Sequence, residues 1–214
     1  MKMDEKILQY IFDHSTPEDP LLEDLYRQTH LKFVNPNMSS GHLLGRTLEM
    51  ISKMIRPAFI LEIGTFTGYS TICLARGLAP GGKLYTIELN DEITSFSRSY
   101  FAKAGLSDKI VQLTGRAQQI VPEINLIFDL VFIDGDKREY IEYFDLVRDK
   151  VPAGGFILAD NVLWGGKVLQ NDPMDAQTRG IIEFNTRIRK EPGFENLILP
   201  LRDGLMLIRK KASH

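Results

Sequence analysis

Hydrophobic residues recur at helical spacing through the first 56 residues, and no strand-like run interrupts them. Residues 4–14 place Ile7, Leu8, Ile11 and Phe12 on one stripe of an amphipathic helix. A second helix is expected to begin with Thr16 as N-cap and Pro17 in its first turn, and a third to span residues 40–55. The apolar face of the second helix comprises Leu21, Leu22, Leu25 and Tyr26, and the candidates for burial in the third helix are Leu43, Leu44, Leu48, Met50, Ile51 and Met54. The pattern therefore predicts a helical N-terminal extension over residues 1–56.

From Pro57 onward, short apolar runs typical of buried strands alternate with helical segments. The first five runs are residues 58–63, 83–87, 110–113, 126–133 (or from 128) and 156–159. Helices are expected from residue 67 or 68, over 91–104, in a short piece before Pro122, through 140–147 and over 173–189. Two last runs, 194–199 and 205–209, flank Arg202-Asp203-Gly204, which is a hairpin turn signal. The alternation predicts one α/β domain: a doubly wound, Rossmann-like, seven-stranded sheet, mostly parallel with a C-terminal antiparallel hairpin, with residues 57–214 as the core.

The first predicted strand runs into a glycine-bearing turn, the place where doubly wound sheets bind nucleotides. Gly64 and Gly68 lack the G-x-G-x-x-G spacing that brings backbone amides against a pyrophosphate, so a pyrophosphate ligand is disfavoured. Glu62 at the strand end instead suits a positively charged ligand, and Glu88, one βα unit later, can accept hydrogen bonds from both hydroxyls of a ribose. Together these residues suggest S-adenosylmethionine, and a tight turn with surface acids is the alternative.

Acidic side chains also follow the fourth and fifth predicted strands. Asp134 and Asp136 follow the fourth, and Asp160 and Asn161 follow the fifth. Ligands of open α/β sheets bind outside the carboxyl ends of the strands, so adjacent fourth and fifth strands would bring Asp134, Asp160 and Asn161 beside the first-strand site. Two carboxylates and an amide oxygen suit Mg²⁺, Mn²⁺ or Ca²⁺, not structural zinc. The alternative is that these acids only cap helices, a common role of aspartate.

Composition limits the class of protein. The chain has 214 residues, 43% of them hydrophobic, and a net charge of −2, which gives no broad basic surface for nucleic acid or an anionic membrane. Its single cysteine, Cys73, lies between Ile72 and Leu74 and is expected to be a packed core thiol. No apolar stretch approaches the roughly 20 residues of a membrane span. The polar N-terminus does not resemble a signal peptide, so a cytoplasmic protein is expected.

Four segments of the chain carry a resemblance to a known family. They are Leu-Glu-Ile-Gly through Tyr-Ser at 61–70, Ile-Glu at 87–88, Phe-Ile-Asp-Gly-Asp-Lys at 132–137 and Ala-Asp-Asn-Val-Leu-Trp-Gly-Gly at 159–166. These segments closely resemble the cation-dependent O-methyltransferase family, class I S-adenosylmethionine-dependent enzymes that include catechol and caffeoyl-coenzyme A O-methyltransferases. The resemblance runs from about Met38 to the C-terminal hairpin. Its most specific part is the last segment, because the spacing of that segment from Asp134 also fits.

The resemblance implies a role for individual residues. Asp134, Asp160 and Asn161 would hold the divalent cation, and Lys137 would act near the reacting hydroxyl, with Asp134 also part of the catalytic centre. Lys137 would be a general base if desolvated there, and only a surface lysine if exposed. Contacts to S-adenosylmethionine are implied or expected for Met38, Ser40, Glu62, Gly64, Thr65, Gly68, Ser70, Glu88, Ala117, Gln118 and Asp134. Trp164 and Asp136 are candidates for the wall of the acceptor site, although a lone tryptophan is at least as often core or interface.

The expected reaction is methyl transfer to a hydroxyl that lies beside a second metal-binding oxygen, as in a catechol-like small molecule. The same family includes enzymes that methylate 5-hydroxyuridine in transfer RNA, which is the alternative acceptor. A catalytically silent cofactor-binding protein is the third hypothesis, and the intact Asp134, Lys137, Asp160 and Asn161 argue against it. The N-terminal helices suggest a homodimer, although such extensions also pack within one chain.

Overall fold

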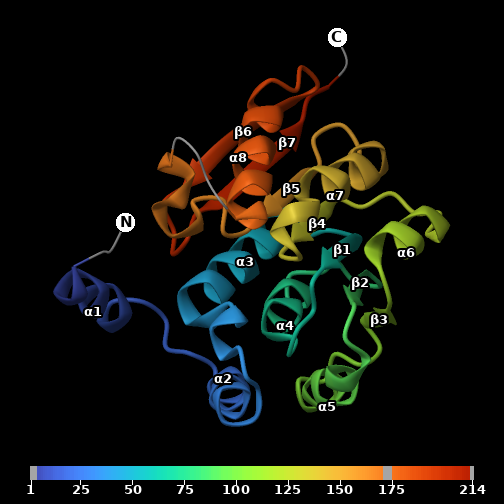
Figure 1. Ribbon diagram of the computed structural model, residues 1–214. Coiled ribbons are helices and arrows are strands. Elements are labelled where there is room, and N and C mark those ends of the chain that lie inside the picture. Colours follow the sequence, from blue (N-terminus) through green and yellow to red (C-terminus); the bar gives the residue numbers. More distant parts are fainter. Residues whose placement is uncertain (1–3, 171–174, 213–214) are drawn as a thin grey trace.

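A computed structural model describes residues 4–170 and 175–212 of the chain. In these residues, seven strands form one sheet in the order β3-β2-β1-β4-β5-β7-β6 (Figure 1). The strands are β1 Phe59–Ile63, β2 Lys83–Glu88, β3 Ile110–Thr114, β4 Leu130–Ile133, β5 Phe156–Ala159, β6 Phe194–Leu199 and β7 Leu205–Lys210. Strands β1 to β5 pair in parallel, whereas β7 is antiparallel to both β5 and β6. The predicted sheet, with its C-terminal antiparallel hairpin, is confirmed.

Helices cover both faces of the sheet, which explains why its central strands β1, β4 and β5 are apolar almost throughout. The helices are α1 Glu5–Asp13, α2 Pro20–Lys32, α3 Gly41–Ile55, α4 Tyr69–Ala75, α5 Thr94–Lys103, α6 Ala117–Glu123, α7 Tyr140–Val147 and α8 Ala176–Arg189, with 3₁₀ turns at Pro36–Met38, Asp91–Ile93, Lys137–Glu139, Arg148–Lys150 and Trp164–Leu169. Successive strand residues point to opposite faces. Ile60 and Leu84 therefore pack with α2 to α5, whereas Leu61 and Val131 pack with α6 to α8. Within the residues described, none of the helices is long and apolar enough to cross a membrane.

The register of the parallel strands aligns the residues that follow them. Ile63 of β1 pairs with Ile87 of β2 and with Ile133 of β4, and Ile133 pairs with Ala159 of β5. The next residue along each strand is therefore part of one row at the carboxyl edge of the sheet. That row consists of Glu88, Gly64, Asp134 and Asp160. Residues nearly 100 positions apart in the chain thus meet at a single edge.

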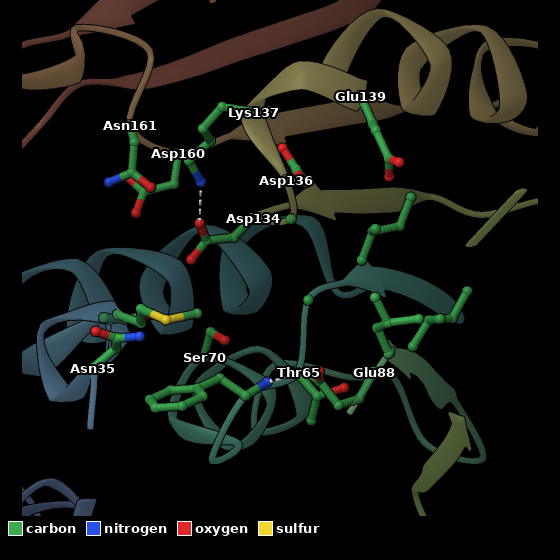
Figure 2. A pocket seen from close by; sticks show the side chains of 18 of the residues that line it. Asn35, Thr65, Ser70, Glu88, Asp134, Asp136, Lys137, Glu139, Asp160 and Asn161 are labelled. Atoms are coloured by element: carbon green, nitrogen blue, oxygen red, sulfur yellow. Dashed lines mark hydrogen bonds and ion pairs between the residues drawn. The ribbon is translucent and has the colours of Figure 1, made fainter. Parts of the chain in front are cut away.

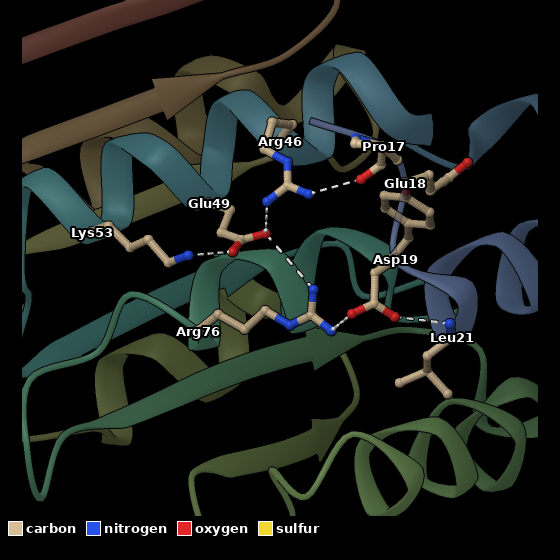
Figure 3. Close-up of polar contacts among 9 residues, drawn as sticks. Pro17, Glu18, Asp19, Leu21, Arg46, Glu49, Lys53 and Arg76 are labelled. Carbon is tan, nitrogen blue, oxygen red and sulfur yellow. Dashed lines mark hydrogen bonds and ion pairs between the residues drawn. The ribbon is translucent and has the colours of Figure 1, made fainter. Parts of the chain in front are cut away.

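A polar network fastens the N-terminal helices to the core (Figure 3). Glu49 of α3 has a side chain only 5% exposed and pairs with Arg46, Lys53 and Arg76, at 3.3, 2.5 and 3.7 Å. Arg76, just after α4, also lies 2.7 Å from Asp19, the N-cap of α2. A buried carboxylate without such partners would be strongly destabilising. The network therefore links α2 and α3 to α4, the helix that follows the glycine turn.

Four expectations about individual elements are wrong. The second helix begins with Asp19 as N-cap and Pro20 in its first turn, not Thr16 and Pro17, because the Asp19 carboxylate accepts a hydrogen bond from Leu21 N. Met50 and Met54 are 52% and 80% exposed, because the buried stripe of α3 is narrower than its apolar pattern. Residues 126–129 precede β4, and α6 continues through Pro122 to Glu123. The expected start of the last helix at residue 173 lies outside the described residues, and Cys73 is buried as expected.

Candidate active site

A pocket of about 960 Å³ opens at the carboxyl edge of the sheet, beside the row of strand-end residues. Figure 2 shows Asp134, Lys137, Asp160 and Asn161 on one side of this pocket and Thr65 and Glu88 on another. Residues 34–40, which precede α3, form a further side. Of the sequence-predicted residues, the following line the pocket: Met38, Ser40, Gly64, Thr65, Ser70, Glu88, Ala117, Gln118, Asp134, Asp136, Lys137, Asp160, Asn161 and Trp164.

Gly64 lets the ends of β1 and β4 approach each other closely. Its φ is 102°, and a Cβ at this position would lie 2.3 Å from the carbonyl oxygen of Asp134. Only glycine combines this backbone conformation with that contact. Gly68, with a φ of 91°, starts α4, and a Cβ there would collide with the Phe101 ring at 2.5 Å. Gly68 therefore allows the turn to pack against Phe101 of α5, and it does not line the pocket.

Glu62 lies beneath the pocket wall. Its side chain is fully buried, and its carboxyl accepts hydrogen bonds from Ser70, Thr71 and Thr86 at 2.6, 2.5 and 2.7 Å. Burial raises the pKa of Glu62 to about 7, although the three hydroxyls oppose the rise. The direct contact between Glu62 and the cofactor that the sequence suggests stays a prediction. In this structure, Glu62 orients Ser70, which itself lines the pocket.

Glu88 is held by two main-chain groups. One carboxylate oxygen accepts a hydrogen bond from Phe66 N at 2.7 Å, and the other accepts one from Asn90 N at 2.9 Å. Each oxygen keeps a further lone pair, so the carboxylate can still accept hydrogen bonds from a ligand. Thr65, also in the pocket wall, shares a hydrogen bond of 2.5 Å with Thr86. The acceptor expected for ribose hydroxyls is thus present and fixed in orientation.

Lys137 is a buried cation at the centre of the site. Its side chain is 8% exposed, and its Nζ donates to Asp134 Oδ1 and to the Tyr140 hydroxyl, both at 2.8 Å. Tyr140 in turn donates to the carbonyl oxygen of Asp160 at 2.9 Å. Lys137 is therefore not an ordinary surface lysine. Lys137 lies three residues after Asp134, at the start of the 3₁₀ turn, and both side chains lie on one side of the pocket.

Asp134, Asp160 and Asn161 come together as expected from the strand order. Asp160 is 2% exposed, and its Oδ1 has no hydrogen-bond partner in the part of the chain that the structure describes. Burial and the negative charge of Asp134 both raise the pKa of Asp160. In residues 4–170 and 175–212, no group of three or more His, Cys, Asp and Glu side chains is placed to hold a metal ion. The candidate set of metal ligands is therefore two carboxylates and one amide. A divalent cation fits this set, because Asp160 Oδ1, which lacks a partner, could coordinate it, and its positive charge would reduce the repulsion between the two carboxylates.

Strained backbone is concentrated around the pocket. Five non-glycine residues of the described chain have a positive φ, and four of them, Phe66, Asn161, Trp164 and Arg202, line the pocket, while Arg56 does not. Left-handed backbone is unfavourable for residues with a Cβ and is found mainly where function requires it. The 3₁₀ segment Trp164–Leu169 is kinked at two left-handed glycines, Gly165 and Gly166, and Trp164 at its start lines the pocket.

Gln118 and Asp136, two further predicted pocket residues, also have protein partners. Gln118 donates to Glu142 at 3.0 Å, and Asp136 accepts from Arg138 N at 3.0 Å as well as pairing with its guanidinium. Asp136 therefore caps the turn at 137–139, whatever further contact it makes. Its expected part in the acceptor site stays a prediction.

Sequence reasoning missed several pocket residues, among them Ser39, Tyr143 and Arg202. Ser39 is 4% exposed, and its Oγ has no partner among the described residues. Tyr143 fills the space left by Gly135, where a Cβ would lie 2.8 Å from its ring. Arg202 was considered only as part of a turn signal. The pattern could assign Tyr143 to a buried helix face, but no local signal marks Ser39 or Arg202, since both depend on contacts with distant segments.

Comparison with known proteins gives a consistent result. Residues 12–211 match the model of a family described as O-methyltransferase. The caffeoyl-CoA O-methyltransferase of Petroselinum crispum is 32% identical over 219 aligned residues, which cover 95% of this chain and 90% of the relative.

Two solved structures are similar throughout. An O-methyltransferase from Bacillus cereus in complex with SAH has a TM-score of 0.86 and 32% identity, and the match covers 96% of this chain and 97% of the other. The O-methyltransferase TomG from Streptomyces achromogenes, in complex with SAM and involved in tomaymycin synthesis, has a TM-score of 0.91 and 30% identity, with 99% and 100% covered.

Proposed function

Because this chain belongs to the O-methyltransferase family, we propose that it transfers a methyl group from S-adenosylmethionine to a hydroxyl of a catechol-like small molecule with the help of a divalent cation. The observation that carries this proposal is the row at the carboxyl edge of the sheet. Glu88 and the glycine turn occupy one end of that row, and Asp134 and Asp160 occupy the other. The pocket thus combines a nucleoside-type site with a hard oxygen site.

Each end of the pocket has a separate task. Glu88 would accept hydrogen bonds from the ribose, and Ser70, oriented by Glu62, would contact the methionine part of the cofactor. Asp134, Asp160 and Asn161 would hold the cation, which supplies positive charge that lowers the pKa of a bound hydroxyl. Lys137 lies 2.8 Å from Asp134, and as a neutral amine, after losing its own proton, it would take up the proton of that hydroxyl. The fixed positions of these groups would align acceptor oxygen and methyl group for in-line attack.

The rim of the pocket supports a small, partly apolar acceptor. Met38 and Trp164 line the opening together with Asn35 and Gln177, so a ring with hydroxyl substituents finds both apolar contact and hydrogen-bonding groups there. The relative from Petroselinum crispum is, by name, an enzyme that methylates a caffeoyl thioester. A chemically similar acceptor with two neighbouring hydroxyls would use both the cation and Lys137.

We further propose that α1 contributes to a homodimer. This helix contains no buried residue, and its apolar side chains Ile7, Tyr10 and Phe12 are 56%, 63% and 37% exposed. Exposed apolar faces of this kind are typical of contacts with another chain. A sedimentation measurement on the full chain would give the mass directly, and a monomer at micromolar concentration would refute the dimer.

The test of the proposed function is transfer of labelled methyl groups from S-adenosylmethionine. The acceptors are a panel of catechols and, for the alternative, unmodified transfer RNA, each assayed with Mg²⁺ or Mn²⁺ and again with excess chelator. We expect labelling of a catechol that is lost on chelation. Labelling of transfer RNA alone would replace the proposed acceptor, and labelling that persists in chelator would remove the cation from the mechanism. Tight cofactor binding without turnover on any acceptor would favour a catalytically silent protein.

A further inference from the structure

Arg202 occupies a position that is unfavourable for any residue with a side chain. It lies in the turn between β6 and β7, where Gly204 N donates to Leu201 O at 2.8 Å, and its φ is 50°. Glycine would adopt this left-handed conformation without strain. An arginine here is therefore explained by its side chain and not by the turn.

The Arg202 side chain lines the pocket and joins the hairpin turn to the segment before α3. It donates to the carbonyl oxygen of Ser40, 162 residues away in the sequence, and to that of Ser39 at 3.3 Å. Both carbonyls belong to the N-terminal rim, which we define as residues 34–40, all of which line the pocket. The guanidinium, with several N–H donors in a fixed plane, suits two adjacent carbonyls in a way that an ammonium does not.

Apart from the buried Ser39 and Ser40, the N-terminal rim is built from local contacts and largely exposed side chains. Met38 N bonds to Asn35 O and Ser39 N to Pro36 O, which are both bonds within the rim itself. Val34 and Met38 are 96% and 58% exposed. The exposed part of this segment gains little from burial. The hydrogen bonds from Arg202 to the carbonyl oxygens of Ser39 and Ser40, which we call the clasp, therefore have a large influence on its position.

The clasp also orients a polar group that lacks a partner. Ser39 lines the pocket, yet its Oγ is buried and has no hydrogen-bond partner within the residues described. Buried hydroxyls are usually satisfied, and an unsatisfied one at a binding pocket indicates a bond that forms with a ligand. Arg202 holds the neighbouring main chain and so fixes where this hydroxyl points.

We propose that Arg202 is a positioning residue that holds the N-terminal rim over the pocket and thereby strengthens the binding of S-adenosylmethionine. This inference rests on the proposed function, since it names the cofactor, but the clasp itself can be tested without any ligand. The turn between β6 and β7 would then contribute to ligand binding, although its sequence predicts only a change of chain direction.

The test compares Arg202→Gly with Arg56→Gly. Arg56 also has a left-handed φ, 53°, but lies at the end of α3 and does not line the pocket. Glycine relieves backbone strain at both positions, so the two variants are matched in that respect and differ in the hydrogen bonds that only Arg202→Gly loses. Only Arg202→Gly should weaken binding of S-adenosylmethionine, by about tenfold, since it loses hydrogen bonds from a charged donor. Arg202→Lys, which keeps the charge and the turn, should lie between the parent and the glycine variant.

Two measurements separate the possible failures. Amide hydrogen exchange of residues 34–40 without ligand should accelerate in Arg202→Gly and not in Arg56→Gly, and unchanged exchange would refute the clasp. Titration calorimetry with S-adenosylmethionine then measures affinity. If the parent binds and Arg202→Gly binds equally well, the role in binding is refuted while the proposed function stands. If the parent does not bind, the proposed function fails, and the role in binding fails with it.

Discussion

Lys137 Nζ lies 2.8 Å from Asp134 Oδ1, so the proposed base and a proposed metal ligand form a buried ion pair. The pair is completed by the Tyr140 hydroxyl, which accepts from the same Nζ. A lysine held in this way cannot turn to solvent, and it is already placed where an acceptor hydroxyl would bind. Proton uptake and cation binding are therefore expected to depend on each other.

Replacing Lys137 by methionine should abolish most turnover and leave cofactor binding intact. General-base catalysis contributes about 10²- to 10⁴-fold, so we expect kcat to fall by at least about 10²-fold. The matched control is Lys167→Met, because Nζ of either lysine lies 6.0 Å from the centre of the Trp164 ring, but Lys167 is half exposed. Initial rates at saturating cofactor measure the effect. Equal rates in the two variants would show that Lys137 is not the base.

Asp160→Asn should separate activity from stability. The amide keeps the shape of the side chain and removes a buried charge that the neighbouring Asp134 repels. We expect turnover to be lost, the affinity for S-adenosylmethionine to stay within about twofold, and the melting temperature without divalent cation to remain or rise by roughly 2–4 °C. Differential scanning calorimetry and the methyl-transfer assay test this. Retention of full cation-dependent activity would exclude Asp160 as a ligand.

Glu62 should make folding stability depend on pH. Its pKa rises from an ordinary 4.5 to about 7 in the folded protein. Between these values the folded protein keeps a proton that the unfolded chain releases, so the free energy of unfolding falls as pH rises from about 4.5 to 7. Glu62→Gln should remove this fall, a difference of about 3 kcal/mol at and above pH 7. Urea unfolding at several pH values measures it.

The control for this experiment is Glu195→Gln, which changes an acid that is 55% exposed and paired with Arg209 at the surface. Its pH profile should match that of the parent. A Glu62→Gln profile that also matches the parent would mean that Glu62 does not retain its proton in the folded state.

Gly64→Ala should damage the site far more than Gly81→Ala. Both glycines have a left-handed φ, 102° and 78°, and an added Cβ at Gly81 meets nothing within 4 Å. Gly81→Ala should therefore lose only about 1–2 kcal/mol from backbone strain. Gly64→Ala adds a collision with Asp134 O, so it should lose several kcal/mol more and bind S-adenosylmethionine weakly. Equal stabilities would indicate that β1 and β4 separate easily.

The strand-end residues of the site could be predicted from the sequence because they depend on register and strand order. Parallel strands of similar length end at the same edge, so Glu88, Asp134 and Asp160 were expected together before any contact was known. The exposed faces of the helices were harder to predict. Apolar spacing predicts which face of α3 is buried. The width of the buried face depends on the elements that pack against α3, and Met50 and Met54 lie outside that face.

Contacts between distant side chains could not be predicted. The burial of Glu62 beneath Ser70 depends on hydroxyls from both α4 and β2, and the bond from Arg202 to Ser40 joins the two ends of the chain. Neither leaves a periodic or local pattern in the sequence. The site therefore combines predictable strand ends with supporting contacts that only the folded chain shows.

The last strand of the chain, β7, lies inside the sheet, between β5 and β6. The turn before it also bonds the segment that follows Asn161, since Val162 N donates to Gly204 O at 3.1 Å and Leu163 N to Asp203 O at 2.8 Å. During synthesis on the ribosome, Asp160 and Asn161, the proposed cation ligands after β5, thus emerge well before the residues that support them. A chain that ends early could fold its cofactor half but could not complete its catalytic half. Only the finished polypeptide would then be active.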